Sequence, residues 1–151
     1  MRIRRDEMSR VTLSGTYNLP FSIIKNDPPE EVDPKLIHLL SEIDKYCGNK
    51  LYVHRLQDPK AKRSSQHFWG RAADIHIETM HVLDQYVLVE RFNGATGLGV
   101  YPKDVWSITP GLHIDVRPQV IGSRWGYIGD GKGGREMVAL SGNFFKHVMS
   151  L

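Results

Sequence analysis

Two segments of the chain alternate strictly between apolar and polar residues. The first covers residues 73–78 and the second covers residues 112–117. Successive side chains of a β-strand point to opposite faces of the sheet, so each segment predicts a strand with one apolar and one polar face. If the two strands are neighbours, their polar faces bring together a set of residues that can ligate metals: Asp74, His76, Glu78, His113 and Asp115.

Helical spacing dominates two other segments. Apolar side chains recur at helical intervals in residues 34–46, where Asp33 is a predicted N-cap, Pro34 takes the first helical position and Gly48 ends the pattern. A second amphipathic helix is predicted within residues 79–93, and short β-prone segments at 51–54 and 97–101 predict two further strands.

The two ends of the chain carry weaker patterns. Residues 1–32 are predicted to be irregular, because glycine and proline interrupt their short apolar stretches. The tail from residue 121 predicts a hairpin or loop around the glycine-rich residues 129–134, followed by a final apolar segment. These glycines lack the strand, the Lys-Ser/Thr pair and the helix of a phosphate-binding loop, so a turn is predicted.

Length and composition limit the possible classes of protein. A chain of 151 residues, 40% hydrophobic and 25% charged, is typical of one folded domain, so residues 1–151 are predicted to form a single domain. The only cysteine, Cys47, cannot form an internal disulfide or a cysteine-rich zinc finger. Any metal must therefore be held by histidine, aspartate or glutamate.

Charge and hydropathy argue against two kinds of partner. Lys and Arg exceed Asp and Glu by only 20 − 17 = 3, and the basic residues are scattered, so no nucleic-acid partner is predicted. The basic start of the chain lacks the apolar run of a secretory signal, and no segment approaches the roughly 20 apolar residues of a membrane span. Synthesis in the cytoplasm without a signal peptide is expected.

A catalytic metal site is one hypothesis for the polar strand faces. His67 lies seven residues before Asp74, and Gly70 between them permits a bend that returns His67 to the strand surface. Three nitrogen and oxygen ligands with a fourth position left for water describe a catalytic zinc site. Such a zinc ion activates water and polarises a carbonyl group, as amide hydrolysis requires.

The residues around this site resemble a known family. Residues 65–74 match the pattern S-x-H-x-x-G-x-A-x-D of the M15-type zinc peptidases, which include D-Ala-D-Ala carboxypeptidases and L-alanyl-D-glutamate or other murein endopeptidases. Residues 97–102, 113–115 and 124–125 resemble the G-x-G-x-Y-P, H-x-D and R-x-W patterns of one branch. The resemblance spans about residues 36 to 126.

The resemblance implies a fold, a cofactor and a substrate. The implied α+β fold, shared with the Hedgehog signalling domain, is a small antiparallel sheet with the metal site on one face and helices on the other. One Zn²⁺ is expected on His67, Asp74 and His113. The implied activity is hydrolysis of peptide bonds in peptidoglycan stem peptides or cross-links, as an endopeptidase or carboxypeptidase, with action on the cell wall after release or within a phage particle.

The catalytic residues depart from the family pattern. Arg55 is the best match to the family arginine that binds a substrate carboxylate or an oxyanion, although the preceding Ser-Gly-Tyr is missing. The acidic residue expected three positions before the third ligand is Pro110. Asp115 is therefore either the general base or a carboxylate that orients a ligand. His76 is not expected to be a ligand.

Two other readings remain open at this point. A zinc-containing module without catalytic activity, of the same fold, would bind cell wall or protein. A basic DNA-associated structural domain would need no metal. Trp69, Tyr101 and Trp125 could line a substrate groove, and packing is the prediction for Trp69.

Overall fold

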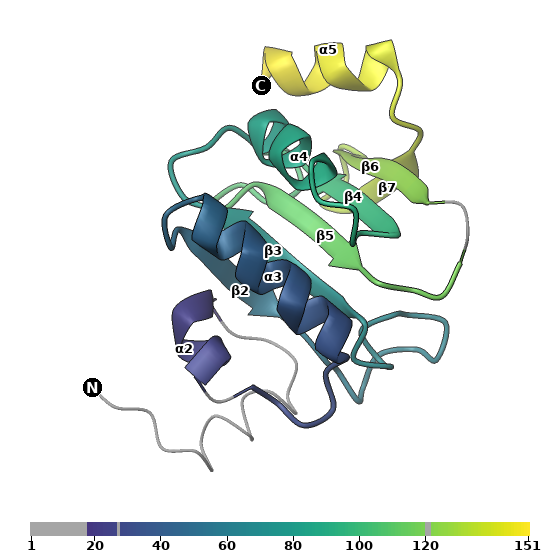
Figure 1. Cartoon of the computed structure of the whole chain (residues 1–151). Helices are drawn as coiled ribbons and strands as arrows, with labels where there is room; N and C mark the ends of the chain where they lie inside the picture. Colours follow the sequence, from purple (N-terminus) through teal and green to yellow (C-terminus); the bar gives the residue numbers. More distant parts are fainter. Residues whose placement is uncertain (1–17, 27, 120–121) are drawn as a thin grey trace.

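The computed structural model describes residues 18–26, 28–119 and 122–151. Its centre is a seven-stranded open sheet with the strand order β1-β2-β3-β5-β4-β6-β7 (Figure 1). All neighbouring strands are antiparallel except β4 and β6, which are parallel. The strands are β1 (Leu19–Pro20), β2 (Leu51–Arg55), β3 (Ala72–Ile77), β4 (Gly97–Tyr101), β5 (Gly111–Asp115), β6 (Ser123–Gly129) and β7 (Arg135–Val138).

Four helices accompany this sheet in the described residues, which makes the architecture α+β. They are α2 (Phe21–Asn26), α3 (Pro34–Tyr46), α4 (Val82–Glu90) and α5 (Gly142–Ser150). Figure 1 shows α3 and α4 on the same side of the sheet. None of the described helices has the length and apolar character that crossing a membrane requires.

Alternation along β3 and β5 separates the two faces of the sheet as predicted. Ile75 and Ile114 are fully buried among the apolar side chains that the helices cover. Asp74 and His113 face the opposite side and are paired in the register of the two strands. The sheet therefore has a helix-covered apolar face and a second face, here called the metal face, that carries the predicted ligands.

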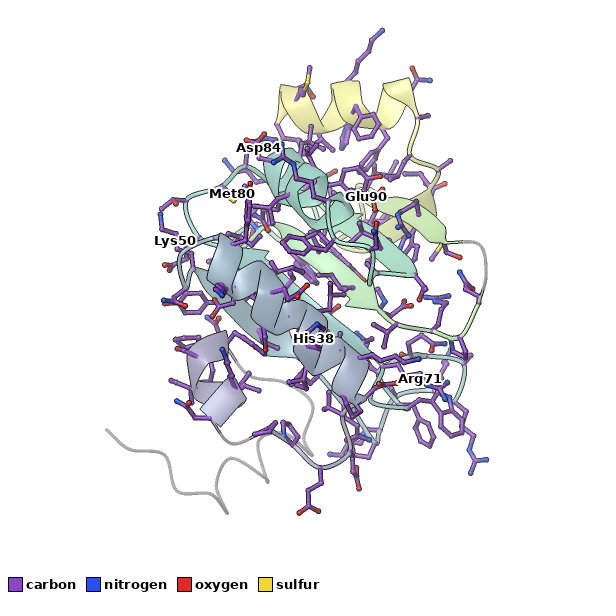
Figure 2. The ribbon with its side chains drawn as sticks, in the orientation of Figure 1. His38, Lys50, Arg71, Met80, Asp84 and Glu90 are labelled. Atoms are coloured by element: carbon purple, nitrogen blue, oxygen red, sulfur yellow. The ribbon has the colours of Figure 1, made fainter. Side chains whose placement is uncertain are left out.

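The helix boundaries follow local signals in the sequence. Asp33 caps α3, and its side chain accepts a hydrogen bond from the Lys35 backbone N–H at 2.9 Å, with Pro34 at the first helical position. His81 caps α4 in the same way through the Leu83 N–H. Figure 2 shows the outer surface of these helices, where His38 on α3 is exposed.

The prediction of irregular chain over residues 1–32 was wrong for residues 19–26 and holds for residues 28–32. Residues 19–26 form strand β1 and helix α2 instead of irregular chain. Phe21 and Ile24 lie at helical spacing and are almost completely buried, so tertiary packing stabilises a helix too short to form alone. Residues 1–17, which the same prediction covered, lie outside the described residues.

The C-terminal segment forms the β6–β7 hairpin and helix α5. The glycine-rich turn joins the two strands, with Gly131 and Gly133 at φ +75° and +82°, a region that glycine adopts without strain. Helix α5 packs Phe144 against Gly126, where an added Cβ would lie 2.4 Å from the phenyl ring. The predicted hairpin, turn and final segment are all present.

Candidate metal centre

Strand pairing and one sharp turn bring the three predicted ligands together. Asp74 on β3 and His113 on β5 are direct partners in the antiparallel register. His67 precedes β3 in a turn where Gly70 has φ +67°, and an added Cβ at this glycine would lie 1.8 Å from the backbone oxygen of Glu31. Only glycine fits there, so Gly70 allows the chain to return His67 to the metal face.

Two of the three separations between the ligand atoms are close to those of a tetrahedral zinc site. The Nε2 atom of His67 lies 3.2 Å from Oδ1 of Asp74, and the Nδ1 atom of His113 lies 3.3 Å from the same oxygen. The ligand atoms of all three residues lie within 4.8 Å of one another. Tetrahedral zinc with bonds of about 2.0–2.1 Å separates its ligand atoms by roughly 3.3 Å.

Hydrogen bonds behind the two histidines determine which ring nitrogens face the centre. The Nδ1 atom of His67 lies 2.7 Å from the carbonyl oxygen of Leu56, and the Nε2 atom of His113 lies 2.7 Å from Oδ2 of Asp115. Both partners accept hydrogen bonds, so these two nitrogens carry the protons. The nitrogens that remain present lone pairs to the carboxylate oxygen of Asp74.

Three lone pairs therefore converge in a buried place. The side chains of His67, Asp74 and His113 are at most 10% exposed, so water screens their repulsion poorly. A cation among them, either a metal ion or an added proton, relieves this repulsion. Two imidazoles and one carboxylate suit Zn²⁺ and also other divalent transition metals, so the donor set fits a metal without identifying it.

The ionisation of these groups reflects the same crowding. Burial raises the pKa of Asp74, but the two histidines outweigh it and hold the pKa well below its usual value. For His113, burial lowers the pKa, whereas hydrogen bonds to Asp115 and Asp74 raise it above its usual value overall. In the absence of a metal, the centre therefore favours a proton on the His113 nitrogen that would otherwise bind the metal.

One side of the centre is sealed by Asp115. Its side chain is completely buried, and its carboxylate contacts the His113 ring and the guanidinium of Arg117. Burial opposes ionisation here, but Arg117 and His113 hold the pKa of Asp115 well below its usual value. Gly97 leaves the room that this carboxylate occupies, since an added Cβ would lie 2.1 Å from it. Of the two roles predicted for Asp115, these contacts favour that of a carboxylate that orients a ligand over that of a general base.

The other side of the centre is open. A hollow of about 420 Å³ includes Asp74 in its wall and is also lined by His54, Arg55, Val105, Trp106 and residues 107–109. The Arg55 guanidinium is bonded to the Asp58 carboxylate at 2.8 Å and lies 3.9 Å from Oδ2 of Asp74. Asp74 of the ligand set and the predicted arginine therefore border the same hollow.

His76 is not one of the three described residues whose ligand atoms converge. Its Nδ1 is hydrogen-bonded to Nε2 of His54, and the two rings stack with centroids 4.7 Å apart. Burial, together with the charge of His76, lowers the pKa of His54 to about 4. His54 is therefore a neutral imidazole at neutral pH and belongs to the wall of the hollow.

Sequence reasoning missed two residues of this wall, His54 and Trp106, and misjudged Trp69 elsewhere in the chain. The alternation of residues 51–54 already places His54 and Tyr52 on one strand face, so a signal for His54 existed. Trp106 lies in the loop after β4, where no periodicity points to it. The packing prediction for Trp69 was wrong, because this side chain is 48% exposed and its Nε1 donates to the Arg63 carbonyl.

Comparison with protein-family models, curated proteins and solved structures finds no match to the chain.

Proposed function

We propose that this protein is a zinc-dependent hydrolase of peptide bonds in peptidoglycan stem peptides or cross-links, with a fold of the Hedgehog/DD-peptidase type. The observation that carries the proposal is the convergence of three lone-pair ligands, His67, Asp74 and His113, beside an open hollow. The resemblance of residues 65–74 and 97–125 to M15-type peptidases supports the choice of reaction and polymer.

His67, Asp74 and His113 would hold the zinc ion. When bound, zinc lowers the pKa of a water ligand and polarises the carbonyl group of a peptide. The chain supplies the orientation of the ligands, because Leu56 and Asp115 hold the two imidazoles by their outer nitrogens. The positive charge of Arg117 balances the negative charge of the buried Asp115 carboxylate. This carboxylate therefore stays ionised and continues to accept a hydrogen bond from His113.

His54 is our candidate for the proton acceptor in the hollow. Asp74 is committed to the ligand set, and Arg55 cannot accept a proton, so His54 is the strongest remaining base among the described residues of this wall. Its pKa of about 4 is close to that of a carboxylate. The side chain therefore has the basicity that the family's acidic residue, replaced here by Pro110, would supply. It would take a proton from the attacking water and return it to the leaving amine.

Arg55 would bind a carboxylate of the substrate beside the scissile bond. Its guanidinium borders the hollow, and Asp58 holds it from one side. Planar N–H groups that remain free can pair with a peptide carboxylate in two parallel hydrogen bonds. A free carboxyl terminus would suit a carboxypeptidase, and an internal carboxylate of a stem peptide would suit an endopeptidase such as a phage or prophage lysin.

The test is digestion of purified peptidoglycan sacculi with the zinc-loaded protein, with and without a chelator. New amino or carboxyl ends, identified by mass spectrometry, are expected only without chelator, and their masses identify the bond that is cut. An Asp74→Ala variant, purified in parallel, controls for contaminating hydrolases. Absence of chelator-sensitive products would defeat the proposal.

A zinc-containing binding module without catalysis is the second candidate. It is favoured by the sealed position of Asp115 and by Pro110, which together leave no carboxylate other than the ligand Asp74 among the described residues that line the hollow. This candidate predicts that the protein sediments with sacculi and releases no fragments. The digestion experiment separates the two functions, because only the enzyme produces new chain ends.

A further inference from the structure

A ladder of stacked rings crosses the metal face beside the candidate centre. Tyr101 on β4 stacks on Trp106 with centroids 3.9 Å apart and an interplanar angle of 9°. Tyr101 also stacks on Tyr127 of β6 at 4.6 Å. The guanidinium of Arg135, on β7, lies over both tyrosines, 5.2 Å from the Tyr101 centroid and 4.7 Å from that of Tyr127. Arg135 therefore ends the ladder with a positive charge held on aromatic faces.

Arg135 differs from Arg55 and Arg117 in having no anionic partner among the described residues. Arg55 is paired with Asp58, and Arg117 is paired with Asp115. In the described part of the chain, the Arg135 side chain has only its contacts with the two aromatic rings. Stacking leaves the N–H groups in the plane of the guanidinium free for an anion.

A second hollow lies where this arginine ends the ladder. It has a volume of about 630 Å³, and its wall contains Arg135, Asp104, Val105, Trp106, the last glycine of β6 and three glycines of the β6–β7 turn. Val105 and Trp106 also line the hollow beside Asp74, so they form a wall that both hollows share. The glycines leave one side of the second hollow free of side chains.

The loop that carries Trp106 is held in place from two directions. The Oδ2 atom of Asp104 accepts the Gly129 backbone N–H at 2.9 Å and lies 2.7 Å from Nε2 of His147 on α5. Asp104 is thus occupied by β6 and α5. Among the described residues that line the second hollow, Arg135 is left as the charge without an ionic partner.

We propose that the second hollow binds a carboxylate of the stem peptide whose scissile bond lies in the first hollow. This inference rests on the proposed function. Stem peptides carry free carboxylates on a backbone long enough to pass over one indole ring. The Arg135 guanidinium pairs with the carboxylate, and Trp106 packs against the aliphatic part of the peptide between the two hollows.

Binding of matched peptides tests this assignment. The probes are L-Ala-γ-D-Glu-L-Lys-D-Ala-D-Ala and two analogues, one amidated at the α-carboxyl of D-Glu and one at the C-terminus. Their affinities for zinc-free protein are measured by calorimetry, and the KM values are measured for zinc-loaded protein. The proteins are the wild type, Arg135→Gln, Arg135→Lys and the control Lys132→Gln, which changes an exposed charge in the same turn outside the hollow.

The expected result is a coupling between one carboxylate and Arg135. One of the two amidations weakens binding to the wild type about 10-fold, because it removes the charge-assisted hydrogen bonds between the carboxylate and Arg135. The same amidation leaves binding to Arg135→Gln unchanged, because this variant has already lost those hydrogen bonds. Arg135→Lys falls between the two, and Lys132→Gln behaves as the wild type. For each combination of protein and peptide, KM rises as binding weakens, and kcat changes little.

The outcomes that overturn the inference are distinct from failure of the proposed function. If the wild type cleaves stem peptides and both amidations act equally on wild type and Arg135→Gln, the second hollow is not the carboxylate site. If the wild type neither binds nor cleaves any probe or sacculi, the proposed function fails and the inference falls with it. Thermal unfolding of each variant verifies that the exposed substitutions leave the fold intact.

Discussion

The two sides of the candidate metal centre have the same kinds of residue in different surroundings. On the sealed side, the Asp115 carboxylate is completely buried between His113 and Arg117. On the open side, the Asp74 carboxylate borders a hollow together with Arg55 and His54. Both carboxylates have a pKa below the usual value, so charge state does not distinguish them.

Access to solvent is what separates the two sides. A buried carboxylate whose oxygens are both committed to neighbours can orient a histidine, but it cannot exchange protons with a substrate. A carboxylate at the edge of a hollow can bind a metal ion that a substrate in the hollow also contacts. The comparison teaches that residues on the same face of a sheet, such as Asp74 and Asp115, acquire different roles according to which segments cover them.

Loss of the ligand carboxylate is expected to have the largest effect. In Asp74→Ala, zinc affinity should fall by more than about 100-fold, beyond the loss typical of an outer hydrogen-bond partner. Two histidines alone would remain to hold the ion, and turnover should be abolished. Titration with a competing chelator measures the affinity. Asp84→Ala, at an exposed position of α4 (Figure 2), is the matched control, and wild-type affinity in Asp74→Ala would refute the metal centre.

Substitution on the open side should affect turnover without affecting the metal. In His54→Gln we expect kcat to fall about 100-fold, the lower range for loss of a general base, with unchanged zinc affinity. His38→Gln, exposed on α3, serves as control. Wild-type turnover in His54→Gln would remove His54 from the mechanism and leave the open side without a proton acceptor.

The sealed side is expected to give the opposite pattern. In Asp115→Asn, zinc affinity should fall by about 10- to 100-fold because the amide orients His113 poorly, and excess zinc should restore turnover. Turnover is therefore measured over a range of free zinc concentrations. Turnover that stays low at saturating zinc would instead indicate that Asp115 acts as the general base, the other role that the sequence left open.

The smallest expected effect is on stability. His54 has a lowered pKa of about 4, so between pH 6.5 and pH 4 the unfolded chain binds a proton that the folded chain does not. The free energy of unfolding of the zinc-free protein should therefore fall as pH drops through this window, by about 1–2 kcal/mol for a partly buried group.

Denaturant unfolding at several pH values measures this dependence. His76 also has a lowered pKa and contributes in the same direction. His54→Gln should flatten the slope between pH 4 and 6.5 without removing it. An unchanged slope in His54→Gln would show that the proton is taken up elsewhere.

Strong local patterns predicted much of the fold. The alternation in residues 73–78 and 112–117 predicted β3 and β5 and the face that carries Asp74 and His113, because a strand reverses its side chains at every residue. The Asp33–Pro34 signal predicted the start of α3. Helix α2 escaped prediction, since six residues carry too little periodicity and packing of Phe21 and Ile24 decides the outcome.

The sequence by itself determined which residues could be ligands and which strand face they share, because residue chemistry and strand periodicity are local properties. Only the tertiary structure decided that Asp115 is sealed behind His113 and that His54 and Trp106 border the open side. It also decided that Arg135 has no anionic partner within residues 18–26, 28–119 and 122–151. These facts depend on which segments far apart in the chain cover each side chain. Burial and pairing arise from that packing, and local pattern does not encode them.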